Sequence, residues 1–344
     1  MVQTEKPLVI PVFIPHFGCP HQCAFCNQSI ITSQASRLPD KSAIHTIITH
    51  YLQYQGKRKR VELAFFGGNF LGLPHNTITQ LLDMVQPYIK EEKIHGIRFS
   101  TRPDTITRPA LERISPYMVS AVELGVQSMD DGVLLKARRG HTSMDTINAI
   151  ALLKAYPFEI GVQVMVGLPG DTDVCLIEST RKLATLCPDI ARIYPLLVLK
   201  GSLMEKWYYQ GKYHPLTLEK SIGLVKKIVG IFKAANVKVI RMGLQASDMM
   251  EDESMVIAGP WHPAFGHLVF SEMLYDLVCS RIEQYQDKSK SGKLVLSIHP
   301  KSESRLRGNR NMNLKRLNQQ YSEFDFSIRP DETIPIDQVE IGET

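Results

Sequence analysis

Residues 8–28 read LVIPVFIPHFGCPHQCAFCNQ, an apolar run followed at once by three closely spaced cysteines. The run 8–15 is rich in Val, Ile and Phe and ends at proline, a pattern that predicts a buried β-strand. Cys19, Cys23 and Cys26 then fall in a CxxxCxxC spacing in the loop that follows this strand. In a reducing compartment, a tight cysteine group of this kind indicates a metal or redox site rather than a disulfide.

The same rhythm of strand and helix continues for about two hundred residues. Further strands are expected at 61–68, 97–103, 118–128, 160–169 and 190–199. Helices are expected between them at 41–55, 75–91, 108–115, 144–155 and 173–187, with Thr142 or Ser143 capping the fourth and Asp173 the fifth. Six such units with near-continuous apolar strands predict an α/β fold, a partial (β/α)6 TIM-like barrel with its chemistry at the strand C-termini.

The pattern changes after residue 199. A helix at 217–235 and a seventh strand at 237–244 are expected, and a second helix at 270–284 precedes a strand at 293–299. We therefore expect a core barrel over 1–245, with its boundary between 200 and 245. An α/β extension over 246–330 and an acidic tail over 331–344 would follow.

Composition narrows the class of protein. The chain has 344 residues, 44% hydrophobic and 22% charged, which is typical of a soluble globular protein. No apolar stretch is long enough for a membrane span, and no signal peptide is expected, so the predicted location is the cytoplasm. The isolated cysteines Cys175, Cys187 and Cys279 are expected to be small buried residues.

Charge is unevenly distributed along the C-terminal part. Residues 281–316 include ten basic and three acidic residues, whereas residues 318–344 include one basic and seven acidic residues. A basic segment beside an acidic tail suggests a surface for a polyanion, with the tail lying outside it. The alternative is a solvated face beside a solubilising tail.

Three thiolates can hold three irons of a cubane cluster and leave the fourth iron open to an external ligand. Zinc is the alternative, and it requires a fourth protein ligand, for which His16 or His21 is available.

The CxxxCxxC spacing with Phe25 before the third cysteine resembles the signature of radical S-adenosylmethionine (SAM) enzymes. The resemblance implies a [4Fe-4S] cluster that binds SAM and cleaves it to a 5′-deoxyadenosyl radical, with electrons from a reductant such as a flavodoxin or ferredoxin. Gly67, Gly68 and Asn69 resemble the family segment that contacts the amino end of SAM. The string GLPG at 167–170, which contains Leu168, resembles the segment that packs near the adenine.

Longer strings resemble one branch of this family, the radical domain of the Elongator catalytic subunit and its stand-alone bacterial relatives. They are STRPD (100–104), VELGVQS (122–128), RRGHT (138–142), VGLPGDT (166–172) and the run 194–213, and the likeness spans about residues 7–245. Elongator-like proteins act on a wobble uridine of transfer RNA with the help of an acetyltransferase domain. No such domain is expected in this chain, so transfer RNA is a candidate partner and the full Elongator reaction is not expected.

The resemblance also implies roles for single residues. Gln127 and Arg139 match polar SAM-contacting positions of the related coproporphyrinogen oxidases. Ser100 and Gln163 stand where relatives carry a carboxylate directed at the ribose. Asn69 stands where relatives carry Glu or Thr, and its amide can still accept from the SAM amino group.

Other interpretations of these residues stay open. Glu123 and Arg139 could form an ion pair across the barrel mouth, and Arg102 with Asp104 a local one. Lys200 follows the sixth strand and is a candidate substrate contact.

Three classes of function therefore remain: a radical enzyme that modifies RNA, one that acts on a small molecule or peptide, and a non-catalytic protein that binds the cluster or SAM. The KRKR run at 57–60 fits RNA, but it precedes the second strand and so lies at the edge away from the chemistry.

Overall fold

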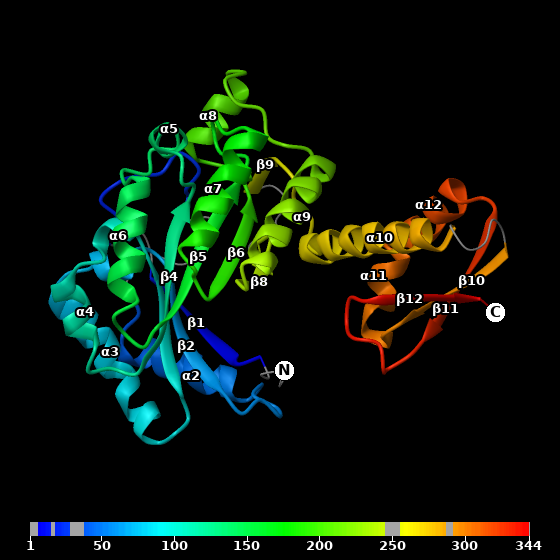
Figure 1. The fold of residues 1–344 in the computed structure, drawn as a ribbon. Coiled ribbons are helices and arrows are strands. Elements are labelled where there is room, and N and C mark those ends of the chain that lie inside the picture. Colours follow the sequence, from blue (N-terminus) through cyan, green and yellow to red (C-terminus); the bar gives the residue numbers. More distant parts are fainter. Residues whose placement is uncertain (1–5, 15–17, 28–37, 245–254, 287–291, 344) are drawn as a thin grey trace. The chain divides into compact units, whose positions relative to one another are not determined.

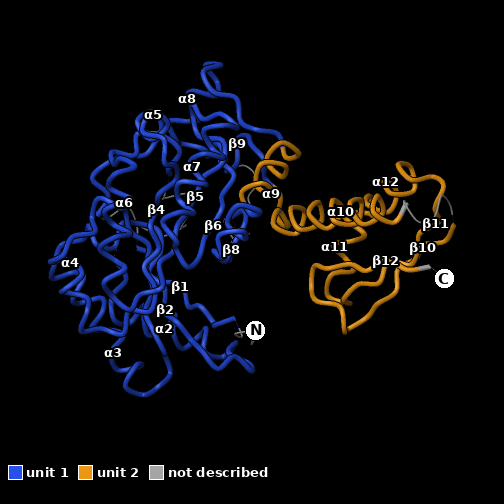
Figure 2. The backbone as a smooth tube through the Cα atoms, viewed as in Figure 1, with its two compact units in different colours: residues 1–217, 229–261 blue, residues 218–228, 262–344 orange. Residues whose placement is uncertain are grey.

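The computed structural model describes residues 6–14, 18–27, 38–244, 255–286 and 292–343. Two compact units divide the chain (Figure 2). Unit 1 comprises residues 1–217 and 229–261, and unit 2 comprises residues 218–228 and 262–344. The sequence predicted a core over 1–245 with its boundary between 200 and 245, whereas this division assigns 218–228 to the C-terminal unit and 246–261 to unit 1.

Unit 1 is built on one sheet of seven parallel strands in the order β1-β2-β3-β4-β5-β6-β8 (Figure 1). The strands are β1 (Leu8–Ile14), β2 (Val61–Gly67), β3 (Gly96–Thr101), β4 (Val119–Gln127), β5 (Glu159–Val166), β6 (Ile190–Pro195) and β8 (Lys238–Met242). The sheet curls into a half-barrel, so the α/β fold and the partial barrel expected from the sequence are confirmed. The seventh strand expected at 237–244 is β8.

Helices connect consecutive strands, as parallel pairing requires. They are α2 (Lys41–Leu52), α3 (His75–Lys90), α4 (Arg108–Ile114), α5 (Asp131–Lys136), α6 (Ser143–Leu153), α7 (Asp173–Thr185), α8 (Leu203–Tyr209) and α9 (Leu218–Ala234), with short 3-10 turns η1 (Phe70–Gly72) and η2 (Pro103–Thr105). The short helices α5 and α8 were not expected from the sequence. Apolar side chains such as Ile48, Leu82 and Ile150 are buried beneath the helices.

Helix capping was predicted correctly at one site and wrongly at another. Thr142 caps α6 in a capping box, in which its hydroxyl accepts from the Asp145 N–H and the Asp145 carboxylate accepts from the Thr142 N–H. At α7 the cap is Thr172, whose hydroxyl accepts from the N–H of Cys175, and Asp173 is already helical. Either residue type can cap a helix, so the choice depends on where the backbone turns.

The expected sixth strand is shorter than predicted. It ends at Pro195, which has no N–H to donate to a neighbouring strand. The chain then forms the short strand β7 (Val198–Leu199), which pairs antiparallel with β9 (Val256–Ala258). Lys200 therefore follows β7 and not the end of a barrel strand.

A network of buried ion pairs crosses the inner face of the half-barrel. Arg98 on β3 contacts Glu62 on β2 at 2.8 Å, Glu123 on β4 at 3.2 Å and Glu159 on β5 at 3.0 Å. Arg192 on β6 forms a bidentate pair with Glu123. Glu123 is only 1% exposed and is shared by both guanidinium groups, whereas Arg98 has a second buried counter-charge in Glu62.

Unit 2 contains a three-stranded sheet in the order β11-β10-β12, in which β10 pairs parallel with β11 and antiparallel with β12. Its elements are α10 (Phe265–Gln286), β10 (Gly292–Ile298), α11 (Glu303–Arg307), α12 (Met312–Gln320), β11 (Phe324–Pro330) and β12 (Val339–Glu343), with the 3-10 turns η4 (Pro300–Ser302) and η5 (Asn309–Asn311). Its core includes Val278, Ile282, Leu296 and Leu317.

The acidic segment 331–344 is not a tail outside the fold. Its residues 339–343 form β12, which pairs with β10 between Val339 and Ile298 and between Ile341 and Leu296. Val339 is buried in the core of unit 2. The alternation of apolar and acidic residues in VEIGE fits an edge strand. Counting only the acidic residues of the segment missed this alternation.

Replacing Glu123 by Gln should lower the free energy of unfolding by about 3–5 kcal/mol, because buried guanidinium groups lose a counter-charge. Urea unfolding followed by circular dichroism measures this change. The matched control is Glu91→Gln, which breaks an exposed pair with Lys93 and should leave the unfolding midpoint unchanged. Equal midpoints for the two variants would contradict a supporting role for the network.

Candidate functional site

The cysteine loop, residues 18–27, follows β1 at the C-terminal edge of the sheet. Its centre is anchored through the backbone of Ala24, whose N–H donates to the Ala137 carbonyl at 3.0 Å and whose carbonyl accepts from the Met204 N–H at 3.0 Å. Ala24 is fully buried in a cluster with Leu168 and Met204, and Phe25 packs against this cluster. The loop is therefore part of the barrel's packed structure.

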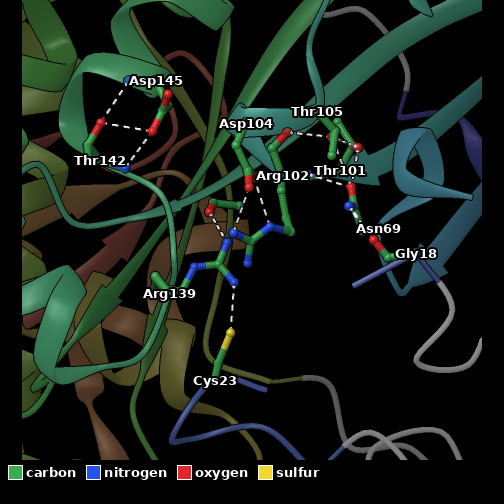
Figure 3. Close-up of polar contacts among 11 residues, drawn as sticks. Gly18, Cys23, Asn69, Thr101, Arg102, Asp104, Thr105, Arg139, Thr142 and Asp145 are labelled. Carbon is green, nitrogen blue, oxygen red and sulfur yellow. Dashed lines mark hydrogen bonds and ion pairs between the residues drawn. The ribbon is translucent and has the colours of Figure 1, made fainter. Parts of the chain in front are cut away.

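Arg139 reaches the loop from the segment after α5 (Figure 3). Its Nη1 lies 3.1 Å from the sulfur of the buried Cys23, and its Nη2 donates to the Gly125 carbonyl on β4. This contact places a positive charge and an N–H donor against the sulfur, an arrangement that suits a cysteine bound to a metal. The carbonyl contact fixes the guanidinium above the sheet.

Cys19 and Cys26 are half-buried. Burial and the neighbouring Cys23 raise the pKa of the Cys19 thiol, while Arg102 and Arg139 act in the opposite direction. Cys23, Arg102 and Arg139 are thus all close enough to Cys19 to change the pKa of its thiol.

The two ion-pair interpretations have different outcomes. Arg102 forms a bidentate pair with Asp104, with both N–O distances 2.9 Å, as the local interpretation expected. The interpretation that Glu123 pairs with Arg139 is wrong, because the Glu123 carboxylate pairs with Arg98 and Arg192. Arg139 is thereby left to contact Cys23.

Within the described ranges, no three His, Cys, Asp or Glu side chains are grouped so that they could hold a metal ion. The three cysteines share one loop without their thiols being in ligand geometry. His21, one of the two zinc-ligand candidates, has its ring against Gly140, where a Cβ on the glycine would overlap it. The other candidate, His16, lies outside the described residues.

Several buried polar atoms beside the cysteine loop have no hydrogen-bond partner among the described residues. They are Gln127 Oε1, Arg139 Nε and Arg102 Nη1. Buried polar atoms are rarely left unpaired in proteins, so such a group indicates a place where a polar ligand binds. Gln127 also has φ +70°, a left-handed conformation that is uncommon for a non-glycine residue and concentrates at functional sites. The residues present therefore fit a cofactor with polar groups of its own.

The other predicted SAM contacts lie at the same edge. Ser100 and Gln163 are half-buried and joined by a hydrogen bond from Gln163 Nε2 to Ser100 Oγ at 3.3 Å. Gly67 ends β2 with φ +104°, a conformation that L side chains rarely adopt, and Gly68 follows it. Asn69 is buried, and its amide is engaged by neighbouring residues.

Lys200 is exposed on the turn after β7, and its backbone carbonyl accepts a hydrogen bond from Asn27 Nδ2 at 2.8 Å. Its observed contact is with the cysteine loop, and a role in binding substrate stays a prediction. Gly18 and Asn27, which flank the three cysteines, were not singled out from the sequence. Their adjacency to the first and third cysteines is the signal that could have identified them.

Two titratable groups near the site have displaced pKa values. Burial, followed by Arg139 and Arg102, lowers the pKa of His141 to about 4, so this imidazole is neutral at pH 7. Burial raises the pKa of Asp171, in the loop after β5, to about 7. His141 therefore adds no positive charge to the two arginines.

The three isolated cysteines differ in how deeply they are buried. Cys187 is exposed at the end of α7, with φ +49°, so the expectation that it is buried is wrong. Cys175 and Cys279 are half-buried. Helix ends are accessible even when the helix packs well, which is why sequence position alone misled here.

A parallel half-barrel that carries three cysteines in its first strand–helix loop, beside orphaned buried polar atoms, is the arrangement of a barrel enzyme with a cofactor at the C-terminal edge of its sheet. The model of the radical SAM superfamily matches residues 13–183, and the model of the radical SAM C-terminal domain matches residues 188–275. The chain belongs to the radical SAM superfamily. It is an enzyme of this class, whose cofactors are a [4Fe-4S] cluster and SAM.

Two proteins of known sequence are similar to about two thirds of this chain. A tRNA uridine(34) acetyltransferase of Dehalococcoides mccartyi is 27% identical over 252 residues, which cover 64% of this chain and 55% of that protein. An uncharacterised protein of Methanocaldococcus jannaschii is 29% identical over 231 residues, covering 64% of this chain and 70% of that protein. This chain thus spans little more than half the length of the acetyltransferase.

Among solved structures, Elp3 of Methanocaldococcus infernus with residues 1–46 deleted has a TM-score of 0.58 and 21% identity, covering 77% of this chain and 63% of that one. This likeness concerns the fold. No helix in the described part of the chain is long and apolar enough to cross a membrane.

Anaerobically reconstituted protein should carry about four irons per chain, and Cys23→Ala should remove most of them, because a buried thiolate ligand is lost. Iron and acid-labile sulfide assays measure this. Cys175→Ala and Cys279→Ala are the controls and should keep the full iron content. Stoichiometric zinc without the visible absorption of an iron–sulfur cluster would contradict the assignment.

Proposed function

We propose that this protein reductively cleaves SAM at the C-terminal edge of its half-barrel and uses the resulting radical to modify RNA. In this proposal Cys19, Cys23 and Cys26 are the cluster ligands. The carrying observation is the Arg139 guanidinium, 3.1 Å from the Cys23 sulfur, at an edge with three orphaned buried polar atoms. The cluster, when bound, supplies the electron that cleaves SAM, with a flavodoxin or ferredoxin as the reductant.

Different residues around the loop contact the cysteine ligands and the amino-acid end of SAM. Arg139 donates to the Cys23 sulfur, and its second contact, with the Gly125 carbonyl, holds the guanidinium in place. Gly67 and Gly68 leave backbone room for the amino-acid end of SAM, since no Cβ projects there. Gln127 offers an unpaired acceptor to a donor of the ligand.

The nucleoside end of SAM would meet the neutral pair Ser100 and Gln163. Their mutual hydrogen bond is long at 3.3 Å, so a ribose hydroxyl can replace it at low cost. Leu168 is buried in the cluster that packs against Phe25, where an apolar side chain can support the adenine. A packed apolar wall also excludes water, which protects a reactive radical.

Gly68→Val should prevent SAM from changing the electron paramagnetic resonance spectrum of the reduced cluster without loss of iron, because the new side chain occupies the space of the methionine end. Anaerobic assays with dithionite should then show at least a tenfold drop in release of 5′-deoxyadenosine. Gly223→Val on α9, where a Cβ has no neighbour within 4 Å, is the matched control and should behave as wild type. Wild-type protein that carries the cluster but releases no 5′-deoxyadenosine would indicate a non-catalytic relative.

The proposal of an RNA substrate rests on two observations. The D. mccartyi relative is named a tRNA uridine(34) acetyltransferase. Unit 2 exposes the basic side chains of Lys301, Arg310 and Lys315 on consecutive elements, from η4 to α12. Arg310 is exposed in a left-handed conformation with φ +50°, and no ion pair to it occurs among the described residues.

The neighbouring arginines differ from Arg310. Arg305 pairs with Asp337, and its guanidinium lies 4.5 Å from the centre of the Phe270 ring. Arg307 pairs with Glu303 at 2.8 Å within α11. Of these arginines, Arg305 pairs with the acidic segment 331–344, and Arg310 is the better candidate for a phosphate contact.

Transfer RNA should bind with an affinity that falls steeply with salt, as phosphate contacts dictate. Arg310→Ala combined with Lys315→Ala should weaken binding and reduce the slope of log K against log salt by about one unit per lost contact. Filter binding at several salt concentrations measures both. Lys93→Ala in unit 1 is the control, and it should leave the slope unchanged.

Arg305→Ala should instead lower the thermal stability of the protein, since that side chain joins Phe270 to Asp337. Absence of RNA binding by wild-type protein at low salt would redirect the search to a small-molecule or peptide substrate.

A further inference from the structure

The cysteine loop is fastened at both ends by side-chain amides. Asn69 Nδ2 donates to the carbonyl of Gly18, the residue before Cys19, at 2.7 Å (Figure 3). Asn27, the residue after Cys26, donates from its Nδ2 to the carbonyl of Lys200 at 2.8 Å. The residues that flank the cysteines are thus tied to two separate parts of the barrel, the end of β2 and the turn after β7.

The amide oxygen of Asn69 is fully used by neighbouring residues. Its Oδ1 accepts from the Thr101 hydroxyl at 2.6 Å and from the Arg102 N–H at 3.0 Å, and the Thr105 hydroxyl lies at 3.0 Å as well. An amide oxygen has two lone pairs, so these donors occupy its acceptor capacity. The side chain is 1% exposed. The Asn69 oxygen therefore has no free lone pair with which to accept a hydrogen bond from the SAM amino group, although the sequence led us to expect this contact.

Close backbone packing explains why an amide is used here. Gly18 has φ +80°, and a Cβ on it would overlap the backbone carbonyl of Asn69. A Cβ on Gly72 would overlap both the Gly18 carbonyl and Asn69 Nδ2. Two glycines therefore create the slot that lets the Asn69 amide reach the loop, and the loop's entry has one way to pack.

We propose that Asn69 and Asn27 are positioning residues that hold the cysteine loop in place before any cofactor binds, and that Asn69 does not contact SAM. The inference rests on this loop as the cluster site of the proposed function. Between the two clamps, the backbone hydrogen bonds of Ala24 fix the centre of the loop. Three attachments along ten residues hold the backbone of the loop, so that the cysteine side chains are what a bound cofactor would still have to order.

The test uses Asn69→Asp, which keeps the acceptor for Thr101 and Arg102 but removes the donor to Gly18. The measurement is hydrogen exchange by mass spectrometry on the cofactor-free full chain. Peptides that cover residues 18–27 should exchange about tenfold faster, equivalent to about 1.4 kcal/mol of lost local stability. Peptides from β4 and β5 should be unchanged, which separates a local effect from unfolding.

Asn27→Asp is the second variant, and it should speed exchange of the same peptides from the other end of the loop. The matched control is Asn313→Asp in unit 2, where a buried Asn Nδ2 donates to Ser271 and Arg305. This control should leave residues 18–27 unaffected. Unchanged exchange of residues 18–27 in both loop variants would overturn the proposal.

A second readout distinguishes positioning from SAM contact. In reconstituted protein, Asn69→Asp should alter the electron paramagnetic resonance spectrum of the reduced cluster in the absence of SAM. If Asn69 instead faced the SAM ammonium, a carboxylate would tighten SAM binding through a charge-assisted bond and leave the SAM-free spectrum unchanged. That result would overturn the proposal. The exchange measurement needs neither cluster nor substrate, so it does not depend on whether the chain cleaves SAM or binds RNA.

Discussion

Parallel pairing of the seven strands is the constraint on which the rest of unit 1 depends. Because each strand runs in the same direction, every segment that follows a strand emerges at one edge of the sheet. The cysteine loop after β1, the glycines after β2, Arg102 after β3 and Gln127 at the end of β4 are brought together in this way. None of them is a neighbour of another in sequence, and the sheet alone makes them neighbours in space.

The strand positions could be predicted because each strand is an apolar run that ends at a glycine, a proline or a polar residue. All eight expected runs start within one residue of an observed strand. The sixth was overextended because Leu196, Leu197 and Val198 are apolar and buried without belonging to the barrel sheet. Hydrophobicity reports burial, and it does not distinguish a sheet residue from a packed loop.

The site was predictable as a set of positions and less so as a set of contacts. The cysteine motif identified the loop, and strand ends identified Gln127 and Gly67. The partners of Arg139 and Asn69 could not be inferred, because a hydrogen bond depends on where a side chain points after packing. Glu123 illustrates this: its sequence position near the barrel mouth suggested Arg139 as a partner, whereas its carboxylate contacts Arg98 and Arg192.

The inner-face network has an electrostatic consequence for the chemistry at the edge above it. Glu62, Glu123 and Glu159 are opposed by Arg98, Arg192 and by Arg60, which contacts Glu62 at 2.7 Å. The charges cancel, so the floor of the barrel contributes little net potential to the site. With Arg102 paired to Asp104 and His141 neutral, Arg139 remains the uncompensated positive charge among the described side chains near Cys23. Positive charge beside a cluster sulfur and exclusion of water are two of the factors that set a cluster's redox potential, so replacing Arg139 would shift the potential of a cluster bound there.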